Sequence, residues 1–386
     1  MISNRISVAA VAMLAWIAAG AQKRLTMQEC IDMAVKNNYG IRAAEGEVEK
    51  SQLMQGSAWD LDKTSLSLKQ DPTSGGSPDN SLTLSQSFDF PTVYALRRRS
   101  LKAETAVAKS RAGLSRKQLS AEVANAYGQM VFVIEKKRIL AEQDTIIGKY
   151  LHLATVRYMA GEARQLEKLT ASRMRSENRM ELEKTDAEYR ALKQKMRELL
   201  NTDEDIAPAD EQQKPLTYEE AGSIDFASTA EGEYYSKALD MGNRKVSEAK
   251  SGYLPNFSVG LSTQMVFKGW NPYHVDRSRF GKGDFMGFEV GVGLPLFFGS
   301  TRAKVKAARK DREITELYGR QSMQRMQTEY DIQKGNYLAA RKRMDYYTGE
   351  GLAEAAAYIK ASCPDAWIMV SFAADADGFT RAGEQA

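Results

Sequence analysis

The sequence predicts a mainly α-helical protein with a small β part, built from long antiparallel coiled-coil helices and two β-hairpins, four strands, per chain. Three observations predict this class. Only nine prolines occur in 386 residues and 27% of the residues are charged, a composition that suits long helices. Apolar residues recur at helical spacing over long stretches. The order helix, hairpin, long helix occurs twice, and such internal repetition reports architecture.

The first helix is expected to begin after Thr26. The tetrapeptide Thr26-Met27-Gln28-Glu29 has the form of a capping box, in which Thr26 is the N-cap and Glu29 reaches back to it. The helix should run to about Ser57. Its apolar side should carry Ile31, Ala34, Val35, Ile41 and Ala44.

Two alternating runs around a turn predict the first hairpin, at residues 64–90. The run "TSLSLKQ" alternates at Leu66 and Leu68, and "DPTSGGSPDN" is dense in turn formers. The run "SLTLSQSFDF" has polar residues on one side. Its other side has Leu82, Leu84, Phe88 and Phe90.

A long helix is predicted at residues 94–159, where no proline occurs. At 1.5 Å per residue, it would be roughly 100 Å long. Gly161-Glu162 should break it, and a return helix should follow at residues 164–200. The apolar residues at helical spacing are Leu119, Val123, Tyr127, Val131 and Ile134 in the long helix and Leu192, Met196 and Leu199 in the return helix.

The pattern then repeats after a polar linker. A helix around Tyr234–Gly252 precedes the strand "LPNFSVGLSTQMVF", and "FMGFEVGVGLPLFF" is the expected return strand, which includes Leu294 and Leu296. The predicted segments are 1–21 signal peptide, 22–206 first repeat, 207–225 linker, 226–354 second repeat with hairpin 256–297 and long helix 301–354, and 355–386 atypical tail.

The strands have about ten residues each, the length that a tilted barrel strand needs to cross a bilayer. One face is apolar and the other is rich in Ser, Thr, Gln and Gly. A half-buried soluble sheet gives the same alternation, but aromatic residues near the strand ends favour a membrane interface. These are Phe257, Phe267, Trp270 and Phe285.

Four strands cannot close a barrel, and open strand edges are not tolerated in lipid because unpaired backbone groups there are costly. Two copies would give a barrel narrow enough to fill its own interior. Three copies would give twelve strands around a passage. The sequence therefore predicts a trimeric 12-stranded β-barrel continued by an α-helical tunnel.

The N-terminus resembles a cleaved signal peptide. Arg5 precedes an apolar run at 8–19, and Ala19-Gly20-Ala21 has the small-x-small form of a cleavage site. No cysteine lies at that junction, since Gln22 would be the first residue after cleavage, so a lipid anchor is not expected. Cys30 and Cys363 make no disulfide framework.

Several functional classes are disfavoured. His152 and His274 have no second ligand at metal spacing, and no cofactor is expected. The small net charge of +4 and the absence of an aromatic-interleaved basic patch argue against nucleic acid. Nothing in the sequence suggests a nucleophile held beside a base, the pattern that would predict an enzyme. The run Arg97-Arg98-Arg99 is either a solvated helix face or an anchor at the periplasmic side of the membrane.

Several motifs together resemble the TolC family of outer-membrane efflux proteins, over roughly residues 22–350. The segment "LTMQECIDMAVKNNYGIRAAE" is similar to the N-terminal helix of the family. The segments "YLPNFSVG" and "VGVGLPLFFGSTRAKVKAA" resemble its second-repeat strands, and "TVRYMAGEARQLEKLTA" resembles its helix-turn tip. The similarity is greatest to the heavy-metal branch, which serves cobalt, zinc, cadmium or copper efflux.

The resemblance implies a passive outer-membrane duct in a Gram-negative bacterium, with a periplasmic helical part. It implies a homotrimer in outer-membrane lipid that docks through its tips to a periplasmic adaptor (membrane fusion) protein and an inner-membrane RND-type pump. Metal ions or small toxic compounds would be the exported solutes. The residues that match the adaptor-docking tip are Arg157, Tyr158, Gly161, Glu162 and Leu166.

The C-terminal region departs from the family pattern. No Tyr-x-x-Gly-Glu tip and no return helix follow the second long helix, and the composition changes from about Ala355. We expect a truncation or frameshift in the gene, which would leave a non-functional channel. A periplasmic coiled-coil scaffold is the other alternative to a channel.

Overall fold

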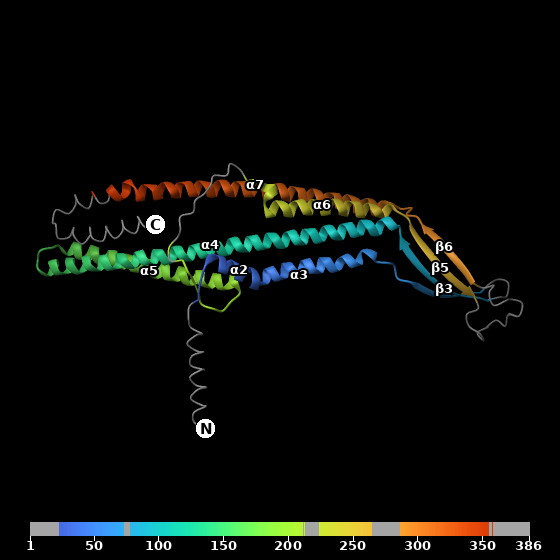
Figure 1. Ribbon diagram of the computed structural model, residues 1–386, viewed down its shortest axis with the longest axis horizontal. Helices are drawn as coiled ribbons and strands as arrows, with labels where there is room; N and C mark the ends of the chain where they lie inside the picture. Colours follow the sequence, from blue (N-terminus) through green and yellow to red (C-terminus); the bar gives the residue numbers. More distant parts are fainter. Residues whose placement is uncertain are drawn as a thin grey trace, which may run out of the picture. The chain divides into compact units, whose positions relative to one another are not determined.

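A computed structural model describes residues 23–72, 78–210, 212, 224–264, 286–354 and 357. The chain divides into two compact units. One comprises residues 1–39, 118–225 and 322–386, and the other comprises residues 40–117 and 226–321. Two long helices, α4 (Pro91–Met159) and α7 (Gly299–Thr348), each contribute to both units (Figure 1). The predicted signal peptide, and the predicted tail except Ala357, lie outside the described residues.

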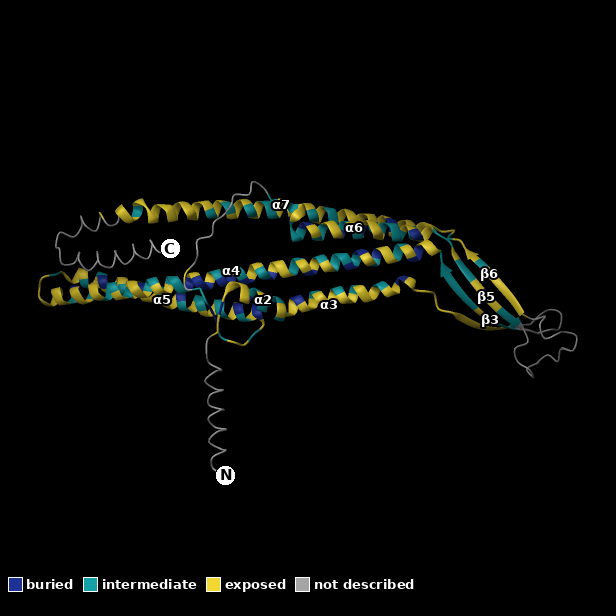
Figure 2. Cartoon of the chain, in the orientation of Figure 1, coloured by how far each residue is buried: buried dark blue, intermediate teal, exposed yellow. Residues whose placement is uncertain are grey.

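The first unit contains α2 (Met27–Asn37), α5 (Gln165–Leu200) and the second half of α4. The predicted capping box is confirmed. The backbone N–H of Thr26 donates to Glu29 Oε2 at 2.8 Å, and the N–H of Glu29 donates to Thr26 Oγ1 at 3.3 Å. The Thr26 backbone is the main cause that lowers the pKa of Glu29. Figure 2 shows buried stretches on α2, α4 and α5. The buried apolar residues of this unit include Cys30, Ala34, Val123, Met130, Val131, Met196 and Leu200.

The first predicted helix is in fact two helices, and the prediction of one helix to Ser57 is wrong. Asn38 has an extended backbone with ψ 128°, and α3 (Tyr39–Met54) begins after it. The side-chain amide of Asn38 donates to the carbonyl of Leu199 at 3.1 Å, and that of Asn201 donates to the carbonyl of Asn37 at 3.2 Å. Asn favours such local breaks because its amide competes for backbone partners. The end of α5 therefore fixes the break.

Two short strands were not predicted from the sequence. β1 (Lys23–Leu25) pairs in parallel with β4 (Ile206–Pro208). Ile206 and Ala207 are buried. The start of the segment predicted as a linker from residue 207 is therefore a buried strand. A three-residue strand has too short a pattern to be recognised without its partner.

The second unit contains α3, α6 (Ala230–Lys250) and the first parts of α4 and α7. The helix α3 leads into the short 3-10 helix η1 (Gln55–Trp59). The hydroxyl of Thr105 in α4 accepts a hydrogen bond from Gln55 at 2.7 Å and donates to the carbonyl of Ser51. Lys245 of α6 forms an ion pair with Glu104 of α4 at 2.8 Å. These contacts link α4 to α3 on one side and to α6 on the other.

A four-stranded antiparallel sheet in the second unit has the order β2-β3-β5-β6. Its strands are β2 (Ser65–Pro72), β3 (Pro78–Asp89), β5 (Asn256–Gln264) and β6 (Met286–Gly293). The two predicted hairpins thus lie side by side, because β3 pairs with β5 from Ser81↔Gln264 to Asp89↔Asn256. No described strand pairs with the outer edge of β2 or of β6.

The second-repeat boundaries differ from the prediction in two places. The return strand ends at Gly293, so Leu294 and Leu296 lie beyond it and are exposed. Pro295 has no N–H to donate to a strand partner, which explains this end. The helix α7 begins at Gly299 and ends at Thr348. A turn at Gly349 separates it from the helical residues 350–354.

Candidate functional site

The turn between α4 and α5 is closed by a Schellman motif. Gly161 has φ +78°, its N–H donates to the carbonyl of Tyr158 at 3.1 Å, and the N–H of Glu162 donates to the carbonyl of Arg157 at 2.9 Å. This pair of hydrogen bonds satisfies carbonyls that would otherwise lack partners at the end of the helix. The break predicted at Gly161-Glu162 is therefore confirmed, and its cause is the left-handed conformation that glycine adopts at little cost.

The five residues predicted at the tip all lie at this turn. Arg157 and Tyr158 are in the last turn of α4, Gly161 and Glu162 form the connection, and Leu166 is in the first turn of α5. All five are exposed. The ammonium group of Lys168 lies 5.5 Å from the centre of the Tyr158 ring. The exposed apolar side chains around the turn are Val156, Met159, Leu166 and Leu169.

Charged pairs connect the two helices behind the turn. Asp144 of α4 accepts from Arg175 and Arg179 of α5, each at 3.4 Å, and these hydrogen bonds lower the pKa of Asp144, with Arg175 as the main cause. Lys136 of α4 pairs with Glu181 of α5 at 2.8 Å, which lowers the pKa of Glu181. The buried small residues Ala154 and Ala171 lie between these pairs and the turn. The ion pairs between the two helices therefore help to fix the register of the hairpin.

The sheet has two chemically different faces. Residues paired across the strands point to the same side, and every second residue of a strand shares that side. Among the residues whose side chains the structure describes, one face is apolar except for Gln86 and Thr263. Its apolar members are Leu66, Leu68, Leu82, Leu84, Phe88, Phe257, Val259, Leu261, Met286, Phe288, Val290 and Val292.

The other face of the sheet consists mainly of Ser, Thr and Gly. Its members include Ser65, Ser67, Ser81, Thr83, Ser85, Ser87, Ser258, Gly260, Ser262, Gly287 and Gly291. The apolar face is not covered in this chain, since Phe288 is 82% exposed and Val290 is 67% exposed. The sheet therefore presents a broad apolar surface to its surroundings and places small polar groups behind it.

Aromatic side chains gather where the strands meet the helices. Phe257, the described member of the predicted interface aromatics, is paired with Phe88 in register and lies 6.0 Å from the Phe90 ring. Phe267, Trp270 and Phe285 lie outside the described residues. Two more ring pairs at this end were not predicted from the sequence. They are Trp59–Tyr94, stacked at 5.3 Å, and Tyr253–Phe298 at 5.6 Å. These four aromatic residues lie next to the predicted strand ends in the sequence, and this position is the feature from which they could have been predicted.

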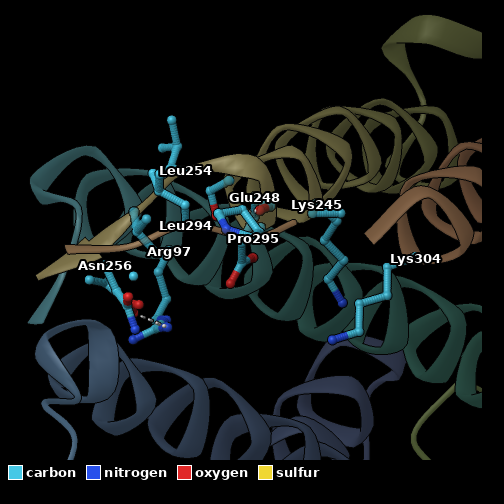
Figure 3. Close-up of a pocket in the computed structure, with 14 residues that line it drawn as sticks. Arg97, Lys245, Glu248, Leu254, Asn256, Leu294, Pro295 and Lys304 are labelled. Carbon is cyan, nitrogen blue, oxygen red and sulfur yellow. Dashed lines mark hydrogen bonds and ion pairs between the residues drawn. The ribbon is translucent and has the colours of Figure 1, made fainter. Parts of the chain in front are cut away.

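A polar cavity of about 730 Å³ lies at the base of the sheet, on the Ser- and Gly-rich side (Figure 3). Arg97 donates to Asp89 at 3.3 Å within it. Lys245 and Lys304 extend from α6 and α7 into the same region (Figure 3). The cavity has charged side chains of both signs, and Arg97 and Lys245 are each paired with a carboxylate.

The three arginines of the run 97–99 differ in their surroundings. Arg97 is partly buried, donates to Asp89 and lies 5.9 Å from the centre of the Tyr94 ring. It therefore ties the first turns of α4 to the end of β3. Arg98 and Arg99 are exposed.

None of the described helices combines the length and the apolar character that a membrane-spanning helix requires. Across the described part of the chain, no group of three or more His, Cys, Asp or Glu side chains is placed to hold a metal ion.

Comparison of the sequence with protein-family models and with curated proteins gave no match. The structure, however, matches solved structures over most of the chain. One is CusC, described in connection with transmembrane channel formation, with 15% identity, a TM-score of 0.67, and coverage of 89% of this chain and 84% of CusC. Another is the outer-membrane protein VceC of Vibrio cholerae, with 16% identity, a TM-score of 0.65, and coverage of 91% and 89%.

The open state of the MtrE outer-membrane channel of Neisseria gonorrhoeae is also similar, with 16% identity, a TM-score of 0.58, and coverage of 87% and 77%. At these identities the likeness establishes the fold. The fold implied by the resemblance to the TolC family is therefore confirmed: long helices with a small antiparallel sheet of four strands.

Proposed function

We propose that this chain is a subunit of an outer-membrane efflux channel, a passive duct rather than an enzyme. Three copies would form a twelve-stranded barrel in the outer membrane of a Gram-negative bacterium, continued by a helical tunnel in the periplasm. The channels CusC, VceC and MtrE have this fold, which supports the proposal by analogy. The heavy-metal branch suggests metal ions as the cargo, and small toxic compounds are the other candidate.

The observation that carries the proposal is the uncovered apolar face of the sheet. It extends over all four strands, and most of its large side chains are exposed in the single chain. A soluble monomer rarely exposes so broad an apolar surface. Lipid covers such a face at no cost, while Ser, Thr and Gly on the other face suit a water-filled interior.

The proposed trimer follows from the strand edges. The outer edges of β2 and β6 have no partner among the described strands. In lipid, each unpaired backbone group would cost several kcal/mol. Pairing of β6 of one copy with β2 of the next would remove every edge and close the barrel.

The turn at Gly161 is the proposed contact with a periplasmic adaptor, which in turn would engage an inner-membrane RND-type pump. Its support is the exposed set Tyr158, Met159 and Leu166 on a Schellman turn that is held by two backbone hydrogen bonds. A preorganised apolar tip loses little conformational entropy when a partner covers it. We also propose the predicted division of the chain into a first repeat at 22–206, a linker at 207–225 and a second repeat at 226–354.

The experiment compares an arginine on each face of the sheet. Val290→Arg places a charge on the apolar face, and Ser262→Arg is the matched control on the polar face. If the apolar face meets lipid, Val290→Arg costs about 2–4 kcal/mol per chain near the bilayer midplane. Membrane retention after urea extraction and the yield of cross-linked trimer should fall strongly for Val290→Arg and little for Ser262→Arg.

A periplasmic scaffold would give a different result. Its sheet would face water or protein, the unmodified chain would be extracted without detergent, and no trimer would be recovered from the outer membrane. That outcome would refute the proposal that this chain forms an outer-membrane channel.

A further inference from the structure

One charged side chain stands out on the polar face of the sheet. Among the described side chains of this face, the charged ones are Lys69, Asp89 and Glu289. Asp89 lies at the helix end and is paired with Arg97. Glu289 lies in the middle of β6, aligned with Gly260, Ser85 and, through them, Ser65.

Glycines surround Glu289 on its own face. Gly287 and Gly291 precede and follow it by two residues, and Gly260 is directly opposite on β5. A Cβ added to Gly260 would lie 3.6 Å from the Cβ of Glu289, an ordinary van der Waals contact, so Gly260 is the immediate neighbour of the glutamate across the strands. Glu289 is exposed, and no ion pair joins it to another residue in the described part of the chain. Its carboxylate therefore extends freely from a surface of small residues.

The alternation within β6 fixes the direction of Glu289. Its neighbours Phe288 and Val290 belong to the exposed apolar face, so Glu289 belongs to the face that would line the water-filled interior of the proposed channel. In a symmetric trimer, the same side chain from each copy lies at one level of the interior. Rings of Asp or Glu favour cations in channels because they attract them and repel anions.

We infer that Glu289 forms a carboxylate ring that makes the channel interior select for cations over anions. This inference rests on the proposed function and adds the charge class of the solutes that pass most readily. Arg97 and Lys245 at the base of the sheet each have an acidic partner, so they do not offset the ring. Lys69 of the same face lies at a different level, four residues along β2 from Ser65, the residue level with Glu289.

The expected size of the effect follows from simple electrostatics. In a barrel of twelve strands, the three carboxylates lie about 10 Å from the axis. Across that distance of water, at an ionic strength where the Debye length is also about 10 Å, they enrich a cation about two-fold and deplete an anion about as much. The ratio of K⁺ to Cl⁻ permeability should therefore be about four-fold higher with the ring than without it.

The test uses the purified full chain in planar lipid bilayers under a KCl gradient. The reversal potential gives the permeability ratio for the unmodified chain, for Glu289→Gln and for Glu289→Asp. We expect Glu289→Gln to lower the ratio about four-fold and Glu289→Asp to preserve it. A second variant, Glu289→Gln with Ser262→Glu, moves the charge to the neighbouring strand on the same face and should restore the ratio. Its uncharged control, Glu289→Gln with Ser262→Gln, should not.

The outcomes distinguish the inference from the proposed function. If the unmodified chain forms no conducting pore, the proposed function fails and the inference falls with it. If pores form but Glu289→Gln leaves the permeability ratio unchanged, the channel stands and the inference is refuted. The inference is also refuted if Glu289→Gln reduces trimer yield at unchanged selectivity, because the carboxylate would then serve an ion pair between copies.

Discussion

Replacing Gly161 with valine should destabilise the turn between α4 and α5 without disturbing the rest of the hairpin. Gly161 has φ +78°, a conformation that costs an L-residue about 1–2 kcal/mol and a β-branched residue more. A Cβ at this position meets no atom within 4 Å, so the cost comes from the backbone and not from a clash. To relieve it, the chain must break the hydrogen bonds from Gly161 and Glu162 to the last carbonyls of α4.

The chain contains its own reference for this effect. Asn201 occupies the equivalent position after α5, with φ +48°, and the N–H groups of Asn201 and Thr202 donate to Glu198 and Arg197. Asparagine is the non-glycine residue that best tolerates this conformation. Gly161→Asn should therefore cost clearly less than Gly161→Val.

Hydrogen–deuterium exchange measured by mass spectrometry provides the assay. A loss of 1–2 kcal/mol should speed exchange in the peptide 157–167 by roughly 5–30-fold in Gly161→Val. The peptide 197–204, which contains the intact Asn201 turn, is the internal control and should not change. Equal exchange in Gly161→Val and the unmodified chain, or equal acceleration in Gly161→Asn and Gly161→Val, would show that the left-handed backbone is not what holds the turn.

Three further predictions concern the first unit, which contains Cys30, Tyr127 and Asp144. Pairing with Arg175 lowers the pKa of Asp144 below its ordinary value of 3.8. The ionised carboxylate therefore stabilises the hairpin at pH values above 3.8, and this stabilisation is lost as the pH falls through the lowered pKa. Asp144→Asn should remove this acid-dependent part of the thermal stability. Burial raises the pKa of Cys30 to about 11, so iodoacetamide at pH 8 should label it far more slowly in the native than in the denatured chain. Tyr127 donates to Asp210 at 2.7 Å, and burial raises its pKa to about 12. Tyr127→Phe should cost about 1 kcal/mol in urea unfolding and remove one tyrosine that titrates late in an ultraviolet pH titration.

The sequence by itself determined where several helices begin and end and which faces of the strands are apolar. The capping box at Thr26 and the break at Gly161 depend on residues within six positions of each other, and both are confirmed. The two-faced strands follow from alternation alone, because successive side chains of a strand point to opposite sides. The signal peptide, the trimer and the docking role of the tip stay predictions.

Tertiary structure decided the features that need a partner far away in the sequence. Asn38 breaks the first helix because its amide reaches the carbonyl of Leu199, 161 positions later. β1 and β4 are too short to show a pattern, and each is a strand only because the other pairs with it. The pairing of β3 with β5 likewise joins the two repeats into one sheet, and it aligns Glu289 and Gly260 of the second repeat with Ser85 of the first. Short-range patterns fix the state of a segment, whereas long-range hydrogen bonds choose where that segment ends and what it faces.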